Sequence, residues 1–310
     1  MNKVIQLLIN KEYRFNALTD KEICRYSWIS DEEFTKRKWK TFFDSELNLD
    51  DPKTFNEKIQ WLKLFYHNPQ YVLMVDKYEA KQIVSDMIGE EHVVLNYGVW
   101  EKFDEIDFSS LPDQFVLKCT HDSGGLVVVR DKSKMNIPEA RKKINACLHK
   151  NFYWHGREWQ YKAVKPRIIA EEFLSDGGST TNEGLGLTDY KFFCFNGEPR
   201  FLYVSKGLEN HRTATISFLT LDWEFADFQR TDYKRMAELP PKPKKFVEMV
   251  EISRKLSHDL PFVRVDLYCV KDLVYFSELT FTPCGGYMTF EKPESDYFVG
   301  EMLKLPKKML

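Results

Sequence analysis

Two short runs near the C-terminus, residues 262–270 and 274–281, constrain the fold more than any other part of the sequence. Both runs alternate polar and apolar side chains, which is the pattern of half-buried strands. If the runs pair as a hairpin across residues 271–273, Asp266 lies opposite Glu278. Like charges that face each other across a sheet destabilise it unless a cation lies between them. The sequence therefore predicts a hairpin with one apolar face in the core and one face that binds a cation.

The polar face of this hairpin has the composition of a magnesium site. Arg264 and Asp266 share one face of the first strand, and Glu278, Thr280 and Thr282 share a face of the second. Carboxylate and hydroxyl oxygens suit a hard ion such as Mg²⁺. The candidate metal ligands are therefore Asp266, Glu278 and Thr280. A surface hairpin whose acids are solvated is the alternative that these residues alone leave open.

Composition excludes several classes of function. Apolar residues make up 43% of the 310-residue chain, and the net charge is −2, so nothing favours nucleic acid or an anionic membrane as a partner. No apolar run approaches the roughly 20 residues of a membrane span, so stable membrane insertion is not expected. The six cysteines are scattered without a CxxC pair, which predicts reduced thiols in a cytoplasmic protein rather than a disulfide framework or a zinc site.

Helical and strand patterns interleave along the chain, which indicates an α+β or α/β fold. Ser30 with Glu33, and Thr54 with Glu57, have the spacing of helix N-caps. The expected helices are residues 57–65, 76–88, 137–150 and 244–259. The expected strands outside the C-terminal hairpin are residues 115–119, 168–174, 189–195 and 199–204.

A second group of residues suits phosphate. Lys118 ends an expected strand, and Ser123, Gly124 and Gly125 follow in a loop of small residues whose amides could form a nest for phosphate oxygens. The loop is not a Walker A motif, because GxxxxGK[ST] is missing, and a plain hairpin loop is the alternative. Lys191 lies in an apolar strand and needs an anionic partner, which Glu171 or a phosphate would supply. An internal ion pair without a ligand is the alternative.

The order of these segments resembles the ATP-grasp superfamily. It runs from Lys118 and the glycine loop through Glu-Glu-Phe-Leu at 171–174 and Asp-Tyr-Lys at 189–191 to Arg-x-Asp at 264–266 and Glu-x-Thr-x-x-Pro at 278–283. Pro-Lys-Thr-Phe-Asn-Glu-Lys at 52–58 and Gly-Arg-Glu-Trp at 156–159 are similar to its TupA-like branch, named for teichuronopeptide synthesis. The resemblance covers roughly residues 30–306.

This resemblance implies an ATP-grasp fold, in which two α+β subdomains clamp ATP, with a helical N-terminal region. The expected parts are residues 1–70 for the helical region and acceptor binding, residues 71–173 for the subdomain with the phosphate loop and lid, and residues 174–310 for the subdomain with the metal hairpin. ATP and Mg²⁺ are the implied cofactors.

The resemblance also implies roles for single residues. Lys118 and Lys191 would bind phosphates, and Ser123, Gly124 and Gly125 would close over them. Glu171 would accept the adenine amino group, and the main chain of Glu172, Phe173 and Leu174 would contact the ring edge. Arg264, with Lys118, would neutralise the transferred phosphoryl group. Asp122 stands where a glycine is expected, and Thr280 stands where many members have Asn.

Four further residues are expected at the acceptor: Arg157, Trp159, Thr282 and Gly285. An Arg can form a bidentate contact with a carboxylate, and a Trp face stacks on sugars. The turn at residues 282–286 can bring main chain close to a ligand. The expected lid is the stretch of residues 153–162. The alternative for its aromatic residues is that they only pack the lid.

The activity that the resemblance implies is ATP- and Mg²⁺-dependent ligation of a carboxylate to an amine through an acyl phosphate. Its partners would be an amino-acid donor and a small-molecule or saccharide acceptor, with a sugar acid or peptide carboxylate in cell-surface polysaccharide synthesis as the joined group. The alternatives are a sugar phosphotransferase, a glycosyltransferase and a non-catalytic nucleotide-binding protein. The sequence lacks an Asp-x-Asp pair, which weakens the glycosyltransferase alternative.

Overall fold

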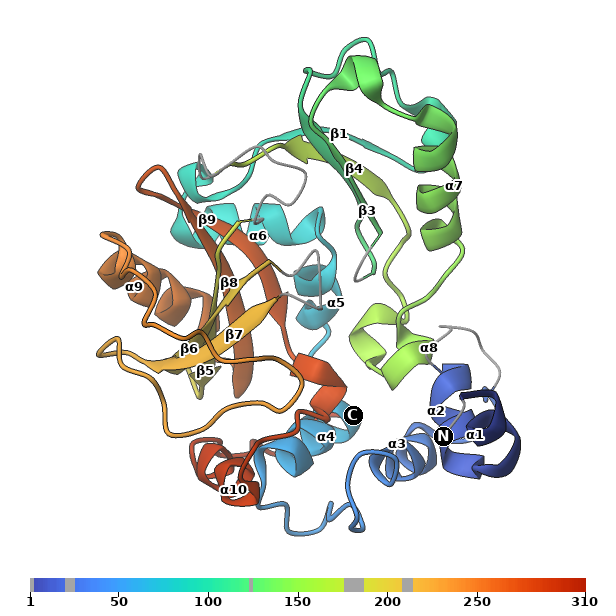
Figure 1. Ribbon diagram of the computed structural model, residues 1–310, viewed down its shortest axis with the longest axis vertical. Helices are drawn as coiled ribbons and strands as arrows, with labels where there is room; N and C mark the ends of the chain where they lie inside the picture. Colours follow the sequence, from blue (N-terminus) through green and yellow to red (C-terminus); the bar gives the residue numbers. More distant parts are fainter. Residues whose placement is uncertain (1–2, 20–25, 123–124, 176–186, 208–213) are drawn as a thin grey trace.

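The computed structural model describes residues 3–19, 26–122, 125–175, 187–207 and 214–310. Two antiparallel sheets form its framework (Figure 1): a four-stranded sheet with the order β1-β4-β2-β3 and a five-stranded sheet with the order β7-β6-β5-β8-β9. Helices accompany both sheets, so the expected α+β class is confirmed.

The four-stranded sheet consists of β1 (Asn96–Trp100), β2 (Phe115–Cys119), β3 (Leu126–Val129) and β4 (Ile168–Glu172). β2 has the bounds that its sequence predicts. Helix α7 (Ile137–Leu148) packs beside this sheet (Figure 1). Its Ile144 forms a core with Leu117 of β2 and Ala170 of β4, all fully buried.

The five-stranded sheet consists of β5 (Asp189–Phe195), β6 (Glu198–Lys206), β7 (Thr215–Thr220), β8 (Phe262–Val270) and β9 (Leu273–Thr280). One of its faces packs on α9 (Phe246–Ser257), α6 (Glu79–Ile88) and α5 (Gln70–Val75) in the largest core. The other face packs on α4 (Phe55–Phe65) and α10 (Pro293–Glu301) in a second core rich in phenylalanine.

That second face changes from apolar to charged along its strands. Phe193 and Phe195 of β5 lie in the phenylalanine-rich core. Asp189 and Lys191 come earlier in the same strand and lie on the same face. On β8, Phe262 belongs to the core, and Asp266 lies opposite Lys191. The phenylalanines fix the strands, and the charged ends of β5 and β8 face the four-stranded sheet.

The β8–β9 hairpin has the predicted register. Asp266 is paired with Glu278, and the turn consists of Lys271 and Asp272 with φ of 51° and 60°. A bulge follows Asp266, which keeps both acids on one face although the turn has an even number of residues. Leu279 points into the core with 2% exposure.

The remaining helices lie towards the N-terminus and the lid. They are α1 (Lys3–Ile9), α2 (Lys11–Thr19), α3 (Asp31–Trp39) and the short α8 (Tyr153–Gly156), which lies against them in Figure 1. Both predicted N-caps are confirmed: Ser30 caps α3, and Thr54 caps α4 in a complete capping box with Glu57. None of the helices in the described ranges combines the length and hydropathy needed to cross a bilayer.

Candidate active site

Lys118 and Glu171 meet where the two sheets face each other. Lys118 Nζ lies 2.5 Å from one oxygen of Glu171, and Lys81 Nζ from α6 lies 2.6 Å from the other. Burial alone would raise the pKa of Glu171, but the two lysines outweigh burial and lower it to about 2. The carboxylate is therefore ionised, and it holds two ammonium groups side by side.

The small pocket at this ion pair is lined from both sheets. Lys77, Lys81, Lys118 and Glu171 contribute from one side, and Tyr268, Phe276 and Ser277 of the β8–β9 hairpin contribute from the other, with Val94 at the edge. Three lysines around one pocket, with a single acid between them, attract an anion such as phosphate.

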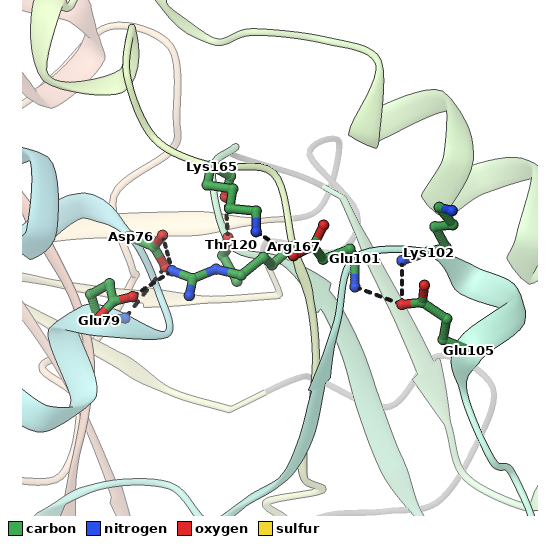
Figure 2. A network of polar contacts seen from close by, with 8 residues as sticks. All are labelled: Asp76, Glu79, Glu101, Lys102, Glu105, Thr120, Lys165 and Arg167. Atoms are coloured by element: carbon green, nitrogen blue, oxygen red, sulfur yellow. Dashed lines mark hydrogen bonds and ion pairs between the residues drawn. The ribbon is translucent and has the colours of Figure 1, made fainter.

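A network of polar contacts around Arg167 joins β4 to the start of α6 (Figure 2). Arg167, just before β4, pairs with Asp76 at 2.7 Å and with Glu79 at 2.8 Å, and both acids lie at the start of α6. Thr120 follows β2, and its main chain donates to Arg167 O and accepts from Lys77 N–H. The ends of β2 and β4 and the start of α6 are thus joined, which sets Lys77, Lys81 and Lys118 around Glu171.

The charged end of the five-stranded sheet carries Asp266 between two cations. Arg264 binds both of its oxygens, at 2.7 Å and 2.6 Å, and Lys191 Nζ lies 2.6 Å from Oδ2. Burial acts to raise the pKa of Asp266, but Arg264 and Lys191 hold it below its ordinary value. Lys191 also pairs with Asp189 at 3.1 Å, so its anionic partners in this structure are Asp266 and Asp189 rather than Glu171.

The donor atoms beside Asp266 fit Mg²⁺. Glu278 is half-buried, and its Oε1 accepts a 3.3 Å hydrogen bond from Thr280 Oγ1. Asp266, Glu278 and Thr280 offer oxygen atoms only, which is the ligand type that Mg²⁺ prefers. Arg264 and Lys191 occupy part of the lone-pair capacity of Asp266. Among the residues that the structure describes, no cation lies within salt-bridge distance of Glu278, so it is the more open of the two carboxylates.

Of the residues expected to contact adenine, those at the end of β4 already have protein partners. The Glu172 N–H donates to Leu95 O at 2.9 Å, so it is already used. Glu172 is exposed, and Phe173 and Leu174 are half-buried and follow β4 directly. Glu171 itself points to the lysines. The main chain of Phe173 and Leu174 is therefore the better candidate for contact with an adenine ring edge.

The expected phosphate loop is described only in part. Ser123 and Gly124 lie outside the described residues, whereas Gly125 is buried and its carbonyl accepts from Cys119 N–H at 2.8 Å. The Asp122 side chain is also buried, with 4% exposure, and it lies beside Cys147 of α7. Its carboxylate is thus withdrawn into the protein, away from the surface of the loop.

Arg157 lies where the lid meets the N-terminal helices and does not have the expected free guanidinium. It is 2% exposed, donates to Tyr26 O at 2.6 Å and lies over the ring of Phe34. Its contacts are therefore with protein groups, which does not fit the expected contact with an acceptor carboxylate. Trp159 likewise packs on His67 and Tyr71, as the packing alternative for the lid predicts.

The turn after β9 meets the lid and α4. Thr282 is buried, and its hydroxyl donates to Glu158 of the lid. Gly285 has φ of 63°, and its carbonyl accepts from Gln60 of α4 at 3.0 Å, so the turn has the unusual backbone angles that its glycines predict. Burial raises the pKa of Glu158 and lowers that of neighbouring Lys63.

Sequence reasoning missed three residues of the pocket: Lys77, Lys81 and Tyr268. Lys77 and Lys81 are four residues apart at an expected helix start, which places them on one side of that helix. That spacing was the available signal. Tyr268 is two residues after Asp266 in β8, so the alternation that puts Arg264 and Asp266 on one face also puts Tyr268 there.

Comparison with known proteins gives one family match. The sequence model described as TupA-like ATPgrasp matches residues 57–304. No curated protein matches the chain.

Several solved structures are similar at low identity. D-alanine–D-alanine ligase from Helicobacter pylori is 17% identical with a TM-score of 0.40, over 75% of this chain and 62% of that one. The enzyme of that name from Bacillus anthracis, complexed with ATP, is 14% identical with a TM-score of 0.39, over 67% and 55%. The ATP-grasp ligase PsnB, complexed with a precursor variant, Mg and ADP, is 11% identical with a TM-score of 0.38, over 70% and 53%. The chain thus spans between 53% and 62% of the length of these three structures.

Proposed function

Because the chain belongs to the TupA-like ATP-grasp family, we propose that it is an ATP- and Mg²⁺-dependent carboxylate–amine ligase. The observation that carries the proposal is one pocket lined by Lys118 of β2 and Lys81 of α6 on one side and by the β8–β9 hairpin, which carries Asp266 and Glu278, on the other. Cations for a triphosphate and oxygen ligands for its metal then lie on the two sides of one cleft. ATP-dependent phosphoryl transfer needs both groups, because it relies on positioning and on charge stabilisation.

ATP would lie with its phosphates towards the lysines and its base towards the segment after β4. Lys81 and Lys118 now share Glu171, and a polyphosphate competes with that carboxylate for the same ammonium groups. Phe173 and Leu174 would contact the adenine edge through their main chain. Lys191, from the facing sheet, would approach the terminal phosphates.

Asp266, Glu278 and Thr280 would hold Mg²⁺. The ion supplies charge neutralisation and orientation to the transferring phosphoryl group. Arg264 adds a fixed positive charge at the same place, since its guanidinium is held by Asp266 and by Thr280 Oγ1 at 2.9 Å. The tight pairing of Arg264 keeps it oriented before substrate arrives.

The proposed reaction has two steps that balance. A substrate carboxylate attacks the γ-phosphorus of ATP, which gives an acyl phosphate and ADP. An amine then attacks the acyl carbon, phosphate leaves, and the amine loses a proton to give the amide. The buried Arg264 and the lysines stabilise negative charge in the first step, and the enclosed cleft protects the acyl phosphate from water.

The proposed substrates are an amino acid and a sugar-acid or peptide carboxylate, joined during cell-surface polysaccharide synthesis. This pathway is proposed because the TupA-like branch is named for teichuronopeptide synthesis. A sugar phosphotransferase is the second candidate, because the same ATP site could phosphorylate a hydroxyl directly.

A product assay separates these functions. Purified protein is incubated with ATP, Mg²⁺, pooled uronic acids and pooled amino acids, and products are read by mass. We expect an amide together with equal amounts of ADP and phosphate. A phosphosugar without free phosphate would establish the second candidate instead. Glu278→Gln should abolish product, and Glu224→Gln, at an exposed position after β7, should leave it unchanged.

A further inference from the structure

A buried cluster of sulfur and oxygen atoms lies behind the phosphate loop. Cys119 is the last residue of β2, Asp122 follows three residues later, and Cys147 belongs to α7. One ligand atom from each residue lies within 4.8 Å of the others. Within the described ranges of the chain, no other group of three such side chains converges in this way.

The cluster contains an unsatisfied charge-bearing atom. Cys119, Asp122 and Cys147 are 1%, 4% and 9% exposed, and Oδ1 of Asp122 has no hydrogen-bond partner. A buried carboxylate oxygen without a partner is costly, because it has lost its water. A bound cation would satisfy it.

Gly125 shows that the space around the cluster is limited. A Cβ at Gly125 would lie 2.7 Å from both Asp122 Oδ2 and Cys147 Sγ, which is closer than real contacts allow. The carboxylate and the thiol can therefore converge only because residue 125 lacks a side chain. Gly125 thus has a role in building this cluster in addition to the phosphate contact expected for it.

We propose that Cys119, Asp122 and Cys147 bind a borderline-soft divalent metal ion, with Zn²⁺ as the best fit. Two thiolates and a carboxylate are ligands of tetrahedral zinc, and the Cys-x-x-Asp spacing matches that of the paired ligands of zinc sites. Tetrahedral ligands at about 2.0–2.3 Å from the metal lie about 3.3–3.8 Å apart. The three ligand atoms already lie within 4.8 Å of one another, so metal binding would draw them together.

The surrounding charge is compatible with this assignment. Two thiolates, one carboxylate and a divalent ion carry a net charge of −1, and Lys77 Nζ hydrogen-bonds the Asp122 carbonyl beside them. A water molecule would complete the fourth position. Cys194, Cys269 and Cys284 do not join the cluster, so the site is specific to two of the five described thiols.

This metal site differs in place and chemistry from the magnesium site. It lies in the four-stranded sheet and uses sulfur, whereas Asp266, Glu278 and Thr280 lie in the other sheet and offer only oxygen. Its role would be structural: the ion joins the start of the phosphate loop to α7, directly after Lys118. The scattered cysteines predicted no zinc site, because only the fold brings Cys147 to Cys119.

Cobalt binding tests the proposal without any enzyme assay. Co²⁺ is titrated anaerobically into reduced, chelator-treated full-length protein. We expect one equivalent to bind with sulfur-to-cobalt charge-transfer absorption and tetrahedral d–d bands, and Zn²⁺ to displace it. Cys119→Ser and Cys147→Ser should lose the charge-transfer band, and Asp122→Asn should weaken binding about tenfold or more. Cys269→Ser, at a half-buried thiol of β8, should behave as wild type.

Cobalt binding by the wild-type protein tests the proposal even if a serine variant fails to fold. Absence of saturable Co²⁺ binding at one equivalent would overturn the proposal. So would a charge-transfer band that survives in folded Cys119→Ser and Cys147→Ser, or a Zn²⁺-induced rise in melting temperature that is equal in wild type and Asp122→Asn. A disulfide between Cys119 and Cys147 in protein prepared under reducing conditions would also contradict it.

Discussion

The two carboxylates of the β8–β9 hairpin occupy different environments although they are paired across the sheet. Asp266 is fully buried and bound by Arg264 and Lys191, whereas Glu278 is half-buried and accepts one hydrogen bond from Thr280. Like charges across a sheet are tolerated here because the protein supplies two cations to one of them. Glu278 is therefore the carboxylate that we propose contributes its charge to Mg²⁺.

Substitution of Glu278 should separate chemistry from folding. Glu278→Gln keeps the shape of the side chain and removes a ligand charge, so we expect a folded protein with ADP release lowered by more than about 100-fold. Leu279→Ala, at the neighbouring buried position, should lower the free energy of unfolding by about 2–5 kcal/mol. Paired melts and ADP-release assays check both. Normal turnover by Glu278→Gln, or unchanged stability of Leu279→Ala, would refute the face assignment.

The ion pairs of Glu171 should make stability depend on pH. Its pKa is about 2 in the folded protein against an ordinary 4.5, so its contribution is present above about pH 4.5 and is lost as the pH falls towards 2. The difference corresponds to about 3 kcal/mol. We expect the stability difference between wild type and Glu171→Gln, measured by urea unfolding, to shrink between pH 5 and pH 3. Glu172→Gln, at the exposed neighbour, should give a difference that is constant with pH.

At the scale of elements, the strands rich in apolar residues over five or more positions were predictable, and two weaker strands were not. β2, β5 and β8 have their predicted bounds, because each is such a run. β1 contains Gly98 and has no buried residue, and β3 is four residues long with two exposed valine and leucine side chains. Their strand structure depends on pairing with β4 and β2, which local sequence does not encode.

The β8–β9 turn offers a test of the hairpin as an element. Lys271 and Asp272 both have positive φ, as a type I′ turn requires, and both are exposed. The double change Lys271→Asn with Asp272→Gly places the favoured Asn-Gly pair there, so we expect the free energy of unfolding to rise by about 0.5–1 kcal/mol. Chemical unfolding measures this effect. A loss of stability, or a change in ATP turnover, would contradict the turn assignment.

At the scale of the whole molecule, the cleft is assembled from segments distant in sequence. The motifs at 118, 171, 191, 266 and 278 could be recognised from their order along the chain, because no single one of them is specific alone. Lys81 was missed and Arg157 was misplaced because their roles depend on tertiary partners, Glu171 for one and Tyr26 with Phe34 for the other. The strands of the site could therefore be predicted from local sequence patterns. Which cations face the cleft could not, because that depends on tertiary packing.

Binding of ATP across the cleft should stabilise the whole protein. A ligand that binds only the folded state raises the melting temperature, so we expect a rise with Mg²⁺–ATP and a much smaller one with UDP-sugars. Lys118→Met should remain folded and show a reduced shift, because one phosphate contact is lost. Lys134→Met, at an exposed lysine of the same subdomain, is the matched control. A larger shift with UDP-sugars would favour the glycosyltransferase alternative.

Transfer of oxygen from the substrate carboxylate to phosphate tests the central claim most directly. The carboxylate substrate identified by the product assay is labelled with ¹⁸O, and the phosphate released in the presence of ATP and amine is analysed by mass. An acyl phosphate requires that one ¹⁸O atom passes from the carboxylate to each phosphate as the amide forms. We predict that the released phosphate carries one ¹⁸O per amide; phosphate without the label would contradict the ligase mechanism.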